Sequence, residues 1–549
     1  MRLLPVIVVV LAVLALTVPF INQPFNQDDR DFVAFARASS NQLVGITLHN
    51  YSYDGVFAKN YHDPHGPVLS TYLGLSLRAG AGESESLFHA LYLIFPLIGG
   101  VSMYYLGRRF TRRPLVAALL LIFTPGFLVM SHTLMDNAPG LSLALAMAAF
   151  YVFGVDRGDS RLLALSGAAM VVAVLTAYQT LSVVPALLLY GFLYGSRGLR
   201  RFLPFVILAA AAALWAIITL KVYGRLPALS YKFRGQSYNW PGFESNSGLK
   251  PVAILVSLAG ASIFPLSVLF LFLRGKKNLA VGAAALGAAA ALVIFLDKPM
   301  QDVSFWQSIQ IILLTFTGIV IIYKIIVSGA AYFFRKDAAS KADFFLLGWF
   351  ASTMGIYILL LVPYVSVRHL LLILPPIILL FVRKLDTLWD NSPRRRLLFI
   401  TTTLFFTLAA GLVASIADYR SASVYPALAQ QLGGMYGEAN QQGTKVYFRG
   451  EFGFRYYLEQ QGFQQLDNKT ELHTGDLVIF SKQSSPASPW PQASYTEIWR
   501  SEPADSFPFR IWNYWAGAGF YTNRMGPLPI TFSNAIQDQF IVYQVRVDN

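Results

Sequence analysis

Long apolar runs recur along almost the whole chain, and most are about as long as a membrane is thick. A helix that crosses the bilayer needs about 20 mostly apolar residues, and thirteen runs of roughly this kind can be read from the 549 residues. They lie at residues 3–21, 86–106, 114–131, 138–155, 162–176, 181–194, 202–222, 251–273, 279–296, 309–334, 344–362, 370–382 and 397–416. Only 13% of the residues are charged, about half the fraction in soluble proteins. The sequence therefore predicts a mainly α-helical, polytopic membrane protein of about thirteen transmembrane helices.

The loops between these runs differ in charge from one side of the membrane to the other. If the N-terminus is cytoplasmic, the cytoplasmic loops are 107–113, 156–161, 197–201, 274–278, 335–341 and 383–396, and every one contains Lys or Arg. Cytoplasmic loops of membrane proteins are rich in these residues. The pattern predicts a multi-pass protein of the cytoplasmic membrane with a cytoplasmic N-terminus. It also explains the net charge of +14 by topology, and argues against nucleic-acid binding.

An odd number of spans places everything after Ile416 on the extracytoplasmic side. We therefore expect a transmembrane domain at residues 1–416, whose first outer loop is 22–85, and an extracytoplasmic α/β domain at residues 417–549. In this tail, residues 445–448, 476–480 and 540–545 have the β-branched and aromatic composition of strands. The chain contains no Cys, so this outer domain must fold without disulfides.

Acidic residues stand at the start of the first outer loop, where Asp28 and Asp29 follow the first span. Farther along this loop, apolar residues recur at helical spacing within 32–36 and again within 69–73. This spacing predicts two amphipathic helices along the membrane interface.

Ionisable residues gather at the predicted outer boundary of the membrane: Asp28, Asp29, His62, His65, Asp136, Lys221, Arg225, Lys298, Arg368 and His369. Charges at this depth are costly and often mark function, although long side chains at such positions also simply reach water. A carboxylate there can act as general base on an acceptor, and basic groups can stabilise the charge of a leaving phosphate. The combination predicts glycosyl transfer from a lipid phosphate whose prenyl tail lies between helices.

Three stretches resemble motifs of the GT-C superfamily of integral membrane glycosyltransferases. Asp28-Asp29, followed by Phe32 and Ala36-Arg37, resembles the acidic motif in the first outer loop of that superfamily. Residues 63–69 resemble its His-Pro-Pro-Leu stretch, and Arg368-His369-Leu370 is similar to its Arg-Tyr-Leu motif, with His in place of Tyr. By layout the chain resembles the protein O-mannosyltransferases and the lipid A aminoarabinose transferase, of which the latter has thirteen spans and a C-terminal periplasmic domain. The resemblance covers about residues 1–416.

This resemblance implies roles for the boundary residues. Asp28 would be the catalytic base or would orient the acceptor, with Asp29 assisting, in a displacement that inverts the anomeric carbon. Arg368 would bind the donor phosphate, because its planar guanidinium can contact two oxygens at once. The other candidates for phosphate binding are His369, Lys221, Arg225 and Lys298. The residues expected to bind substrate or to order the loop are His62, Asp63, His65 and Asp136.

The partners expected from these roles are a polyprenyl-phosphate-linked sugar, an acceptor glycan, lipid or protein, and membrane lipid. The sequence identifies no cofactor, but His62, Asp63 and His65 together with Asp28 offer ligand atoms for a divalent metal. Asp136 has a second interpretation, because Asp is a common N-cap and the fourth span begins just after it.

The alternative function is a flippase or secondary transporter for lipid-linked sugars that uses the same boundary charges. Such proteins are built from internal repeats and bind their substrates near mid-membrane, whereas this sequence has its charges at the boundary and no evident repeat. An oligosaccharyltransferase would carry a Trp-Trp-Asp stretch in the tail, where residues 512–515 instead read Trp-Asn-Tyr-Trp.

Overall fold

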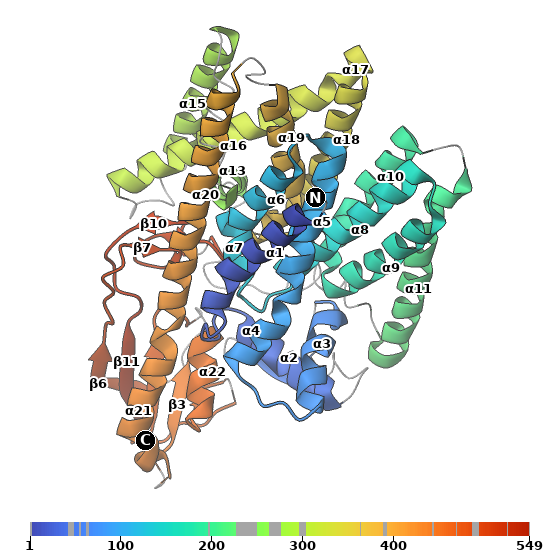
Figure 1. Ribbon diagram of the computed structural model, residues 1–549. Coiled ribbons are helices and arrows are strands. Elements are labelled where there is room, and N and C mark those ends of the chain that lie inside the picture. The colour runs from blue at the N-terminus through green and yellow to red at the C-terminus, as the bar shows by residue number, and fades with distance from the viewer. Residues whose placement is uncertain are drawn as a thin grey trace.

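Figure 1 shows the computed structural model of the chain. It describes residues 3–41, 49–53, 56–61, 65–195, 198–224, 226, 250–262, 276–295, 304–362, 364–387, 392–441, 444–467, 469–485, 493–523 and 525–547. Most of these residues are helical. The described strands belong to a hairpin in the first outer loop and to the C-terminal part.

Six of the described helical segments are long and apolar enough to cross a membrane. They are Glu85–Phe110, Asn137–Arg157, Leu199–Val222, Phe305–Arg335, Ala338–Leu361 and Pro393–Glu438. Shorter apolar helices accompany them at Leu4–Phe20, Pro114–Phe123, Ser160–Thr176, Tyr178–Tyr194, Lys250–Ser262 and Leu279–Leu292. The predicted mainly helical, multi-pass architecture is confirmed, and the total of thirteen spans stays a prediction.

The helical bundle is organised around one central helix, α8 (Asn137–Arg157), which is buried along most of its length. The other helices are α1 (Leu4–Thr17), α4 (Glu85–Tyr92), α5 (Ile94–Phe110), α6 (Pro114–Phe123), α7 (Pro125–Met130), α9 (Ser160–Thr176), α10 (Val184–Tyr194), α11 (Leu203–Tyr223), α13 (Lys250–Ser262), α15 (Lys276–Phe295), α16 (Phe305–Ala330), α17 (Tyr332–Arg335), α18 (Ala338–Ser352) and α19 (Leu374–Thr387). Small residues let α8 approach its neighbours closely, as is usual between membrane helices. A Cβ on Gly99 of α5 would lie 2.6 Å from the hydroxyl of Ser142, and one on Gly154 would lie 2.9 Å from Leu163 of α9.

The first outer loop forms two helices, as its apolar spacing predicts. They are α2 (Asp29–Asn41) and α3 (Pro67–Arg78), and the apolar residues Phe32, Phe35 and Leu69 are buried. The two helices pack against each other closely enough that a Cβ on Gly74 of α3 would lie 2.7 Å from the carbonyl of Ala36. Between them, β1 (His49–Tyr53) and β2 (Val56–Tyr61) form an antiparallel hairpin, which was not predicted.

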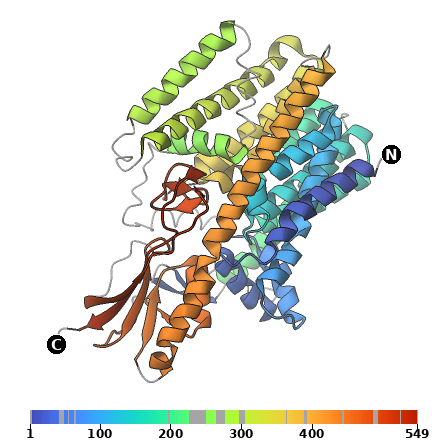
Figure 2. The ribbon, with the colours of Figure 1, turned by 60° about the vertical axis from the view of Figure 1, so that its left-hand side comes forward.

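The C-terminal part begins on a long helix, α20 (Pro393–Ala422), and continues through α21 (Val424–Gln441) into a five-stranded sheet of order β4-β3-β5-β11-β6. The strands are β3 (Val446–Arg449), β4 (Gln464–Gln465), β5 (Leu477–Ser481), β6 (Ser494–Ser501) and β11 (Phe540–Arg546). The three predicted strands are β3, β5 and β11, so those predictions are confirmed. Figure 2 shows α20 running along the bundle and leading into the sheet at one end of the molecule. The predicted boundary after residue 416 falls within α20, and the division into two domains stays a prediction.

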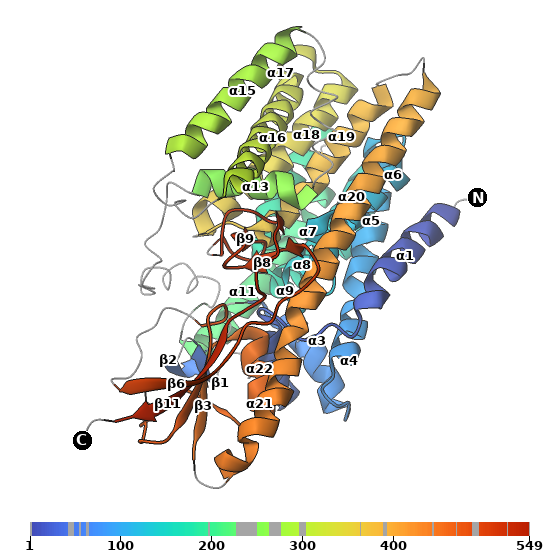
Figure 3. The ribbon, with the colours of Figure 1, turned by 90° about the vertical axis from the view of Figure 1, so that its left-hand side faces the viewer.

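The C-terminal part packs directly on the first outer loop. Helix α22 (Phe452–Gln460) lies against α2, and a Cβ on Gly453 would come within 2.2 Å of the carbonyl of Phe25. The hydroxyl of Tyr457 accepts a hydrogen bond from the backbone N–H of Phe25 at 2.9 Å and donates one to Glu85 at 2.7 Å. Figure 3 shows the sheet, α22, α3 and α4 at the same end of the molecule. The first outer loop is therefore enclosed between membrane helices and the tail.

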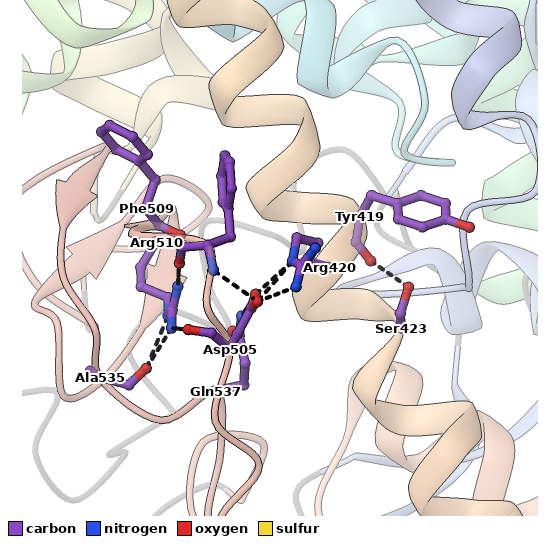
Figure 4. Close-up of polar contacts among 9 residues, drawn as sticks. Tyr419, Arg420, Ser423, Asp505, Phe509, Arg510, Ala535 and Gln537 are labelled. Carbon is purple, nitrogen blue, oxygen red and sulfur yellow. Dashed lines mark hydrogen bonds and ion pairs between the residues drawn. The ribbon is translucent and has the colours of Figure 1, made fainter.

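A second attachment joins α20 to the loops beyond the sheet (Figure 4). The guanidinium of Arg420 on α20 donates to both carboxylate oxygens of Asp505. Asp505 also accepts from the side chain of Gln537 at 2.8 Å. Nearby, the buried guanidinium of Arg510 donates to the carbonyls of Ala535 and Asp505 and so holds these loops together.

Candidate functional site

The acidic pair stands where the chain turns into α2. Gln27 adopts a left-handed conformation with φ of 45°, which is uncommon for a residue other than glycine and is often found at functional sites. The carbonyl of Asp28 then accepts hydrogen bonds from the N–H groups of Asp31 and Phe32, which start the helix. The chain reversal and the helix start together set the position of the Asp28 side chain.

Asp28 forms an ion pair with a residue that is 340 positions away in the sequence. Nη1 of Arg368 lies 2.7 Å from Oδ2 of Asp28, and Nη2 of the same guanidinium donates to the hydroxyl of Tyr364 at 2.9 Å. The side chains of Asp28 and Arg368 are 25% and 13% exposed, respectively. The structure thus brings these two candidate residues together, in a place that stays partly accessible to solvent.

Arg368 is carried by the 3₁₀ segment η7 (Val367–Ile373), which leads into α19. Ser366 caps this segment, and Nδ1 of the buried His369 accepts a hydrogen bond from the backbone N–H of Ser366 at 3.2 Å. His369 therefore stabilises the turn that carries Arg368. The ring of Tyr364 packs edge-on against the ring of His369, with 5.3 Å between the centroids. The phosphate-binding role that the sequence suggested for His369 stays a prediction, since its ring is buried and its Nδ1 is engaged by Ser366.

Two further predicted residues meet beside this ion pair. Nδ1 of His65, at the start of α3, lies 3.1 Å from Oδ2 of Asp136, and the His65 ring packs on Phe32, one helical turn after Asp28, at 5.2 Å between centroids. Asp136 occupies the N-cap position of α8, but its side chain makes no capping hydrogen bond. Its neighbour Met135 contacts Arg368, with Sδ 3.6 Å from Nη1. Asp136 therefore contacts His65 of the first outer loop with its side chain and does not cap α8.

Asp29, in contrast to Asp28, is completely buried and joins two loops. Its Oδ2 accepts the N–H of Asn26 at 2.9 Å, and its Oδ1 accepts the N–H of Leu134 at 2.7 Å. Burial raises the pKa of Asp29, while these two N–H donors oppose the shift. The carboxylate thus fixes the first outer loop to the segment that carries Met135 and Asp136.

We expect Asp29→Asn to destabilise the fold. The new amide group would place an N–H against one of the two backbone N–H donors, and a buried donor without an acceptor costs about 1–3 kcal/mol. The thermal midpoint of the purified protein in detergent should fall, whereas Asp31→Asn two positions later should change it little. An unchanged midpoint together with lost activity would instead place Asp29 in the chemistry.

The remaining candidates do not join this group. Lys221 is exposed on the last turn of α11, and no ion pair connects it to the described residues of the site. Arg225, Lys298, His62 and Asp63 lie outside the described residues. Within the described part of the chain, no three His, Asp or Glu side chains are grouped as a metal site would require. The suggested metal site, which depends on His62 and Asp63, stays a prediction.

A buried polar network behind the site was not predicted from the sequence. Asp418 of α20 accepts hydrogen bonds from the side chain of Gln23 and from the hydroxyl of Tyr521, each at 2.8 Å. Gln23 in turn contacts the ring of His132 at 2.9 Å, and the carbonyl of Tyr521 accepts from the hydroxyl of Ser366 at 2.8 Å. A tail residue is thus inserted next to the turn that carries Arg368. No spacing marks these residues, because they come from separate regions of the chain.

We expect Tyr521→Phe to lower stability, because it removes the hydroxyl that donates to the buried Asp418. The loss should be about 1–3 kcal/mol in the free energy of unfolding, measured as a lower thermal midpoint in detergent. Tyr514→Phe is the matched control, since Tyr514 is an exposed tyrosine of the same tail. Equal midpoints for the two variants would contradict a stabilising role for the network.

Residues 65–222 match the family described as dolichyl-phosphate-mannose-protein mannosyltransferase. This segment begins at His65 and contains Asp136 and the helices α3 to α11. The resemblance to protein mannosyltransferases that the sequence suggested is confirmed over this segment. No curated protein matches by sequence.

Several solved structures are similar to this chain at low identity. ArnT from Cupriavidus metallidurans bound to undecaprenyl phosphate has 12% identity and a TM-score of 0.45, over 88% of this chain and 93% of that one. AglB from Archaeoglobus fulgidus, with an inhibitory peptide and a dolichol-phosphate, has 12% identity and a TM-score of 0.42, over 87% and 69%. The arabinofuranosyltransferase AftD from Mycobacteria has 12% identity and a TM-score of 0.44, over 99% and 40%.

Proposed function

We propose that this GT-C membrane protein transfers a sugar from a polyprenyl-phosphate donor to an acceptor at the outer face of the cytoplasmic membrane. The observation that supports this most is the partly exposed ion pair between Asp28 and Arg368, with His65 and Asp136 beside it. The family match over residues 65–222 adds independent support. A site of this kind supplies a base, a cation for phosphate and a position at the edge of the apolar helices.

Arg368 is the proposed ligand of the donor phosphate. Its guanidinium is planar and can offer two N–H groups to two oxygens of one phosphate. One edge of this group currently meets Asp28, and the other meets Tyr364. A phosphate that binds Arg368 would compete with the Asp28 carboxylate for the same donor, so donor binding would release Asp28 toward the acceptor.

Asp28 is the proposed general base. The acceptor hydroxyl or amine attacks the anomeric carbon while the bond from that carbon to the phosphate oxygen breaks, and the phosphate departs with the bonding electron pair. Asp28 takes the proton of the acceptor, and Arg368 stabilises the charge that grows on the phosphate. In-line attack opposite the departing phosphate inverts the anomeric configuration. Asp136 orients the ring of His65 at the side of this centre.

The membrane topology in this proposal is the one predicted from the charges of the loops. The N-terminus and the basic loops lie in the cytoplasm, and the first outer loop and residues 417–549 lie outside, where lipid-linked sugars are used. The tail then has a structural task, because Tyr521 and α22 hold the first outer loop and η7 together.

The direct test uses the purified chain in lipid nanodiscs. We expect it to release free polyprenyl phosphate from a polyprenyl-phosphate sugar in the presence of a membrane extract that contains the acceptor, as measured by mass spectrometry. Comparison of membrane lipids and envelope glycans with and without the gene would identify donor and acceptor together. Sugar transfer from a nucleotide sugar alone, or transport of the lipid-linked sugar without release of polyprenyl phosphate, would contradict the proposal.

A further inference from the structure

A turn of the C-terminal part packs on two apolar helices of the bundle. Leu528 is buried in one apolar cluster with Val256 of α13 and Ile311 of α16. Pro529 follows it and lies so close to Gly260 of α13 that a Cβ there would come within 2.5 Å of the proline ring. At this point the C-terminal part therefore contacts the membrane helices themselves, in addition to the first outer loop.

A hydrogen bond attaches the neighbouring hairpin to the first turn of α16. The hairpin consists of the antiparallel strands β8 (Trp512–Asn513) and β9 (Ala518–Gly519), which Figure 3 shows beside α13. In its turn, the carbonyl of Ala516 accepts a hydrogen bond from Nε2 of Gln307 at 2.7 Å. The side-chain oxygen of the same Gln307 accepts the N–H of Ser304, which caps α16. The amide of Gln307 thus fixes the hairpin turn next to the start of this helix.

Two aromatic residues directly precede each partner of this hydrogen bond. On α16, Phe305 and Trp306 are each 73% exposed, with 5.6 Å between the centroids of their rings. In the hairpin turn, Tyr514 is 55% exposed and Trp515 is half-buried, and their rings meet edge-on with 5.8 Å between centroids. Large exposed aromatic side chains that lie together usually mark an interaction surface.

The surface of α16 indicates which partner covers these aromatic rings. Leu313 is exposed seven positions after Trp306 and so lies on the same face of the helix. Because this helix belongs to the apolar segment Phe305–Arg335, which is long enough to cross a membrane, its exposed leucine faces lipid. Trp and Tyr are enriched where such helices reach the headgroups, since their rings are apolar and their N–H or O–H groups can bind water. Trp306 therefore marks the level at which the lipid-facing surface of α16 meets the headgroups.

We propose that Tyr514 and Trp515 of the hairpin turn insert into the headgroup layer of the outer leaflet, next to Phe305 and Trp306. Gln307 sets the depth of the turn, because it joins the turn to a helix that crosses the bilayer. The bilayer then supports the C-terminal part as a second partner besides the first outer loop. The inference uses the predicted topology, which places the start of α16 on the extracytoplasmic side, and does not depend on the proposed sugar transfer.

The test measures the depth of the hairpin turn in the bilayer. The chain has no Cys, so a single introduced Cys can be labelled with a fluorophore at a known position. The full-length variant Tyr514→Cys is labelled in phosphatidylcholine nanodiscs, and quenching by a lipid with a nitroxide on its headgroup is measured. Ile498→Cys is the matched control, because Ile498 is also an exposed apolar residue of the tail but lies on β6, an edge strand of the five-stranded sheet. Trp306→Cys gives the reference depth on α16.

We expect the label at position 514 to be quenched about as strongly as the label at position 306, and several-fold more strongly than the label at position 498. This result would place the turn within about 10 Å of the boundary between headgroups and acyl chains. Equal quenching at positions 514 and 498 would overturn the inference. Protection of the label at position 514 by added envelope glycan, without quenching by lipid, would assign the aromatic pair to an acceptor glycan and overturn it as well. A chain that is inactive in sugar transfer gives the same readout, so failure of the proposed function would leave this result unchanged.

Discussion

Asp28→Asn should reduce sugar transfer by about 10²–10⁴-fold, which is the usual contribution of a general base. Asparagine has nearly the same shape and can still accept a hydrogen bond from Arg368, but it cannot take the proton of the acceptor. The side chains of the pair are 25% and 13% exposed, and the amide oxygen of the variant keeps a partner for the Arg368 guanidinium, so no buried charge is left without a hydrogen bond. The variant should therefore fold and bind donor, and its defect should appear in kcat, measured as the rate of polyprenyl phosphate release.

Asp31→Asn is the matched control for this experiment. The same substitution is made three positions later in the chain. The carboxylate of Asp31 forms an ion pair with Arg30, whereas that of Asp28 forms one with Arg368. Its transfer rate should stay near that of the wild-type protein. Near-normal transfer by Asp28→Asn, or an equal loss in both variants, would show that Asp28 is not the base.

Arg368→Lys should lower kcat/KM for the donor by about 10–100-fold, although it preserves the positive charge. A lysine is a point charge and cannot contact Asp28 and Tyr364 through two edges of one planar group. The loss of one hydrogen bond to a charged partner costs about 1.5–3 kcal/mol. Arg368→Gln, which also removes the charge, should cause a still larger loss. Initial rates over a range of donor concentrations measure both effects.

Arg420→Lys provides the comparison for the loss of a bidentate guanidinium outside the site. Arg420 holds Asp505 with two nitrogens, as Arg368 holds its two partners, but it lies on α20 where α20 meets the tail loops (Figure 4). Its variant should keep the affinity for donor. If Arg368→Lys and Arg368→Gln left kcat/KM for the donor unchanged, the donor phosphate would have to bind elsewhere in the protein.

The helical part and three strands of the tail were predictable because their signals are local. Apolar runs of membrane length, the helical spacing within residues 32–36 and 69–73, and the β-rich stretches of the tail each depend on about 5 to 20 neighbouring residues. These predictions were confirmed in α2, α3, β3, β5 and β11. The hairpin of β1 and β2 was missed although its signal is also local, because Asp54-Gly55 is a turn pair that stands between the two strands in the sequence.

The candidate site was predictable in part. Asp28, Arg368, His65 and Asp136 carry chemistry that is unusual at a membrane boundary, and the structure brings these four together in two neighbouring pairs. Asp29 and His369 stand next to them in the sequence, but they are buried and hold backbone groups. Sequence proximity cannot separate these cases, because adjacent side chains point in different directions.

Composition and charge alone were sufficient to determine that this chain is a multi-pass membrane protein, since hydrophobicity and charge act on each segment independently. Only the tertiary structure could show that Asp28 forms an ion pair with Arg368, 340 residues away, and that Asp29 instead accepts a backbone N–H of Leu134. It also shows that the carbonyl of Tyr521, from the tail, binds Ser366 at the turn that carries Arg368. Such contacts depend on how distant segments pack around the buried groups, and each buried donor or acceptor must find a partner wherever the fold brings one.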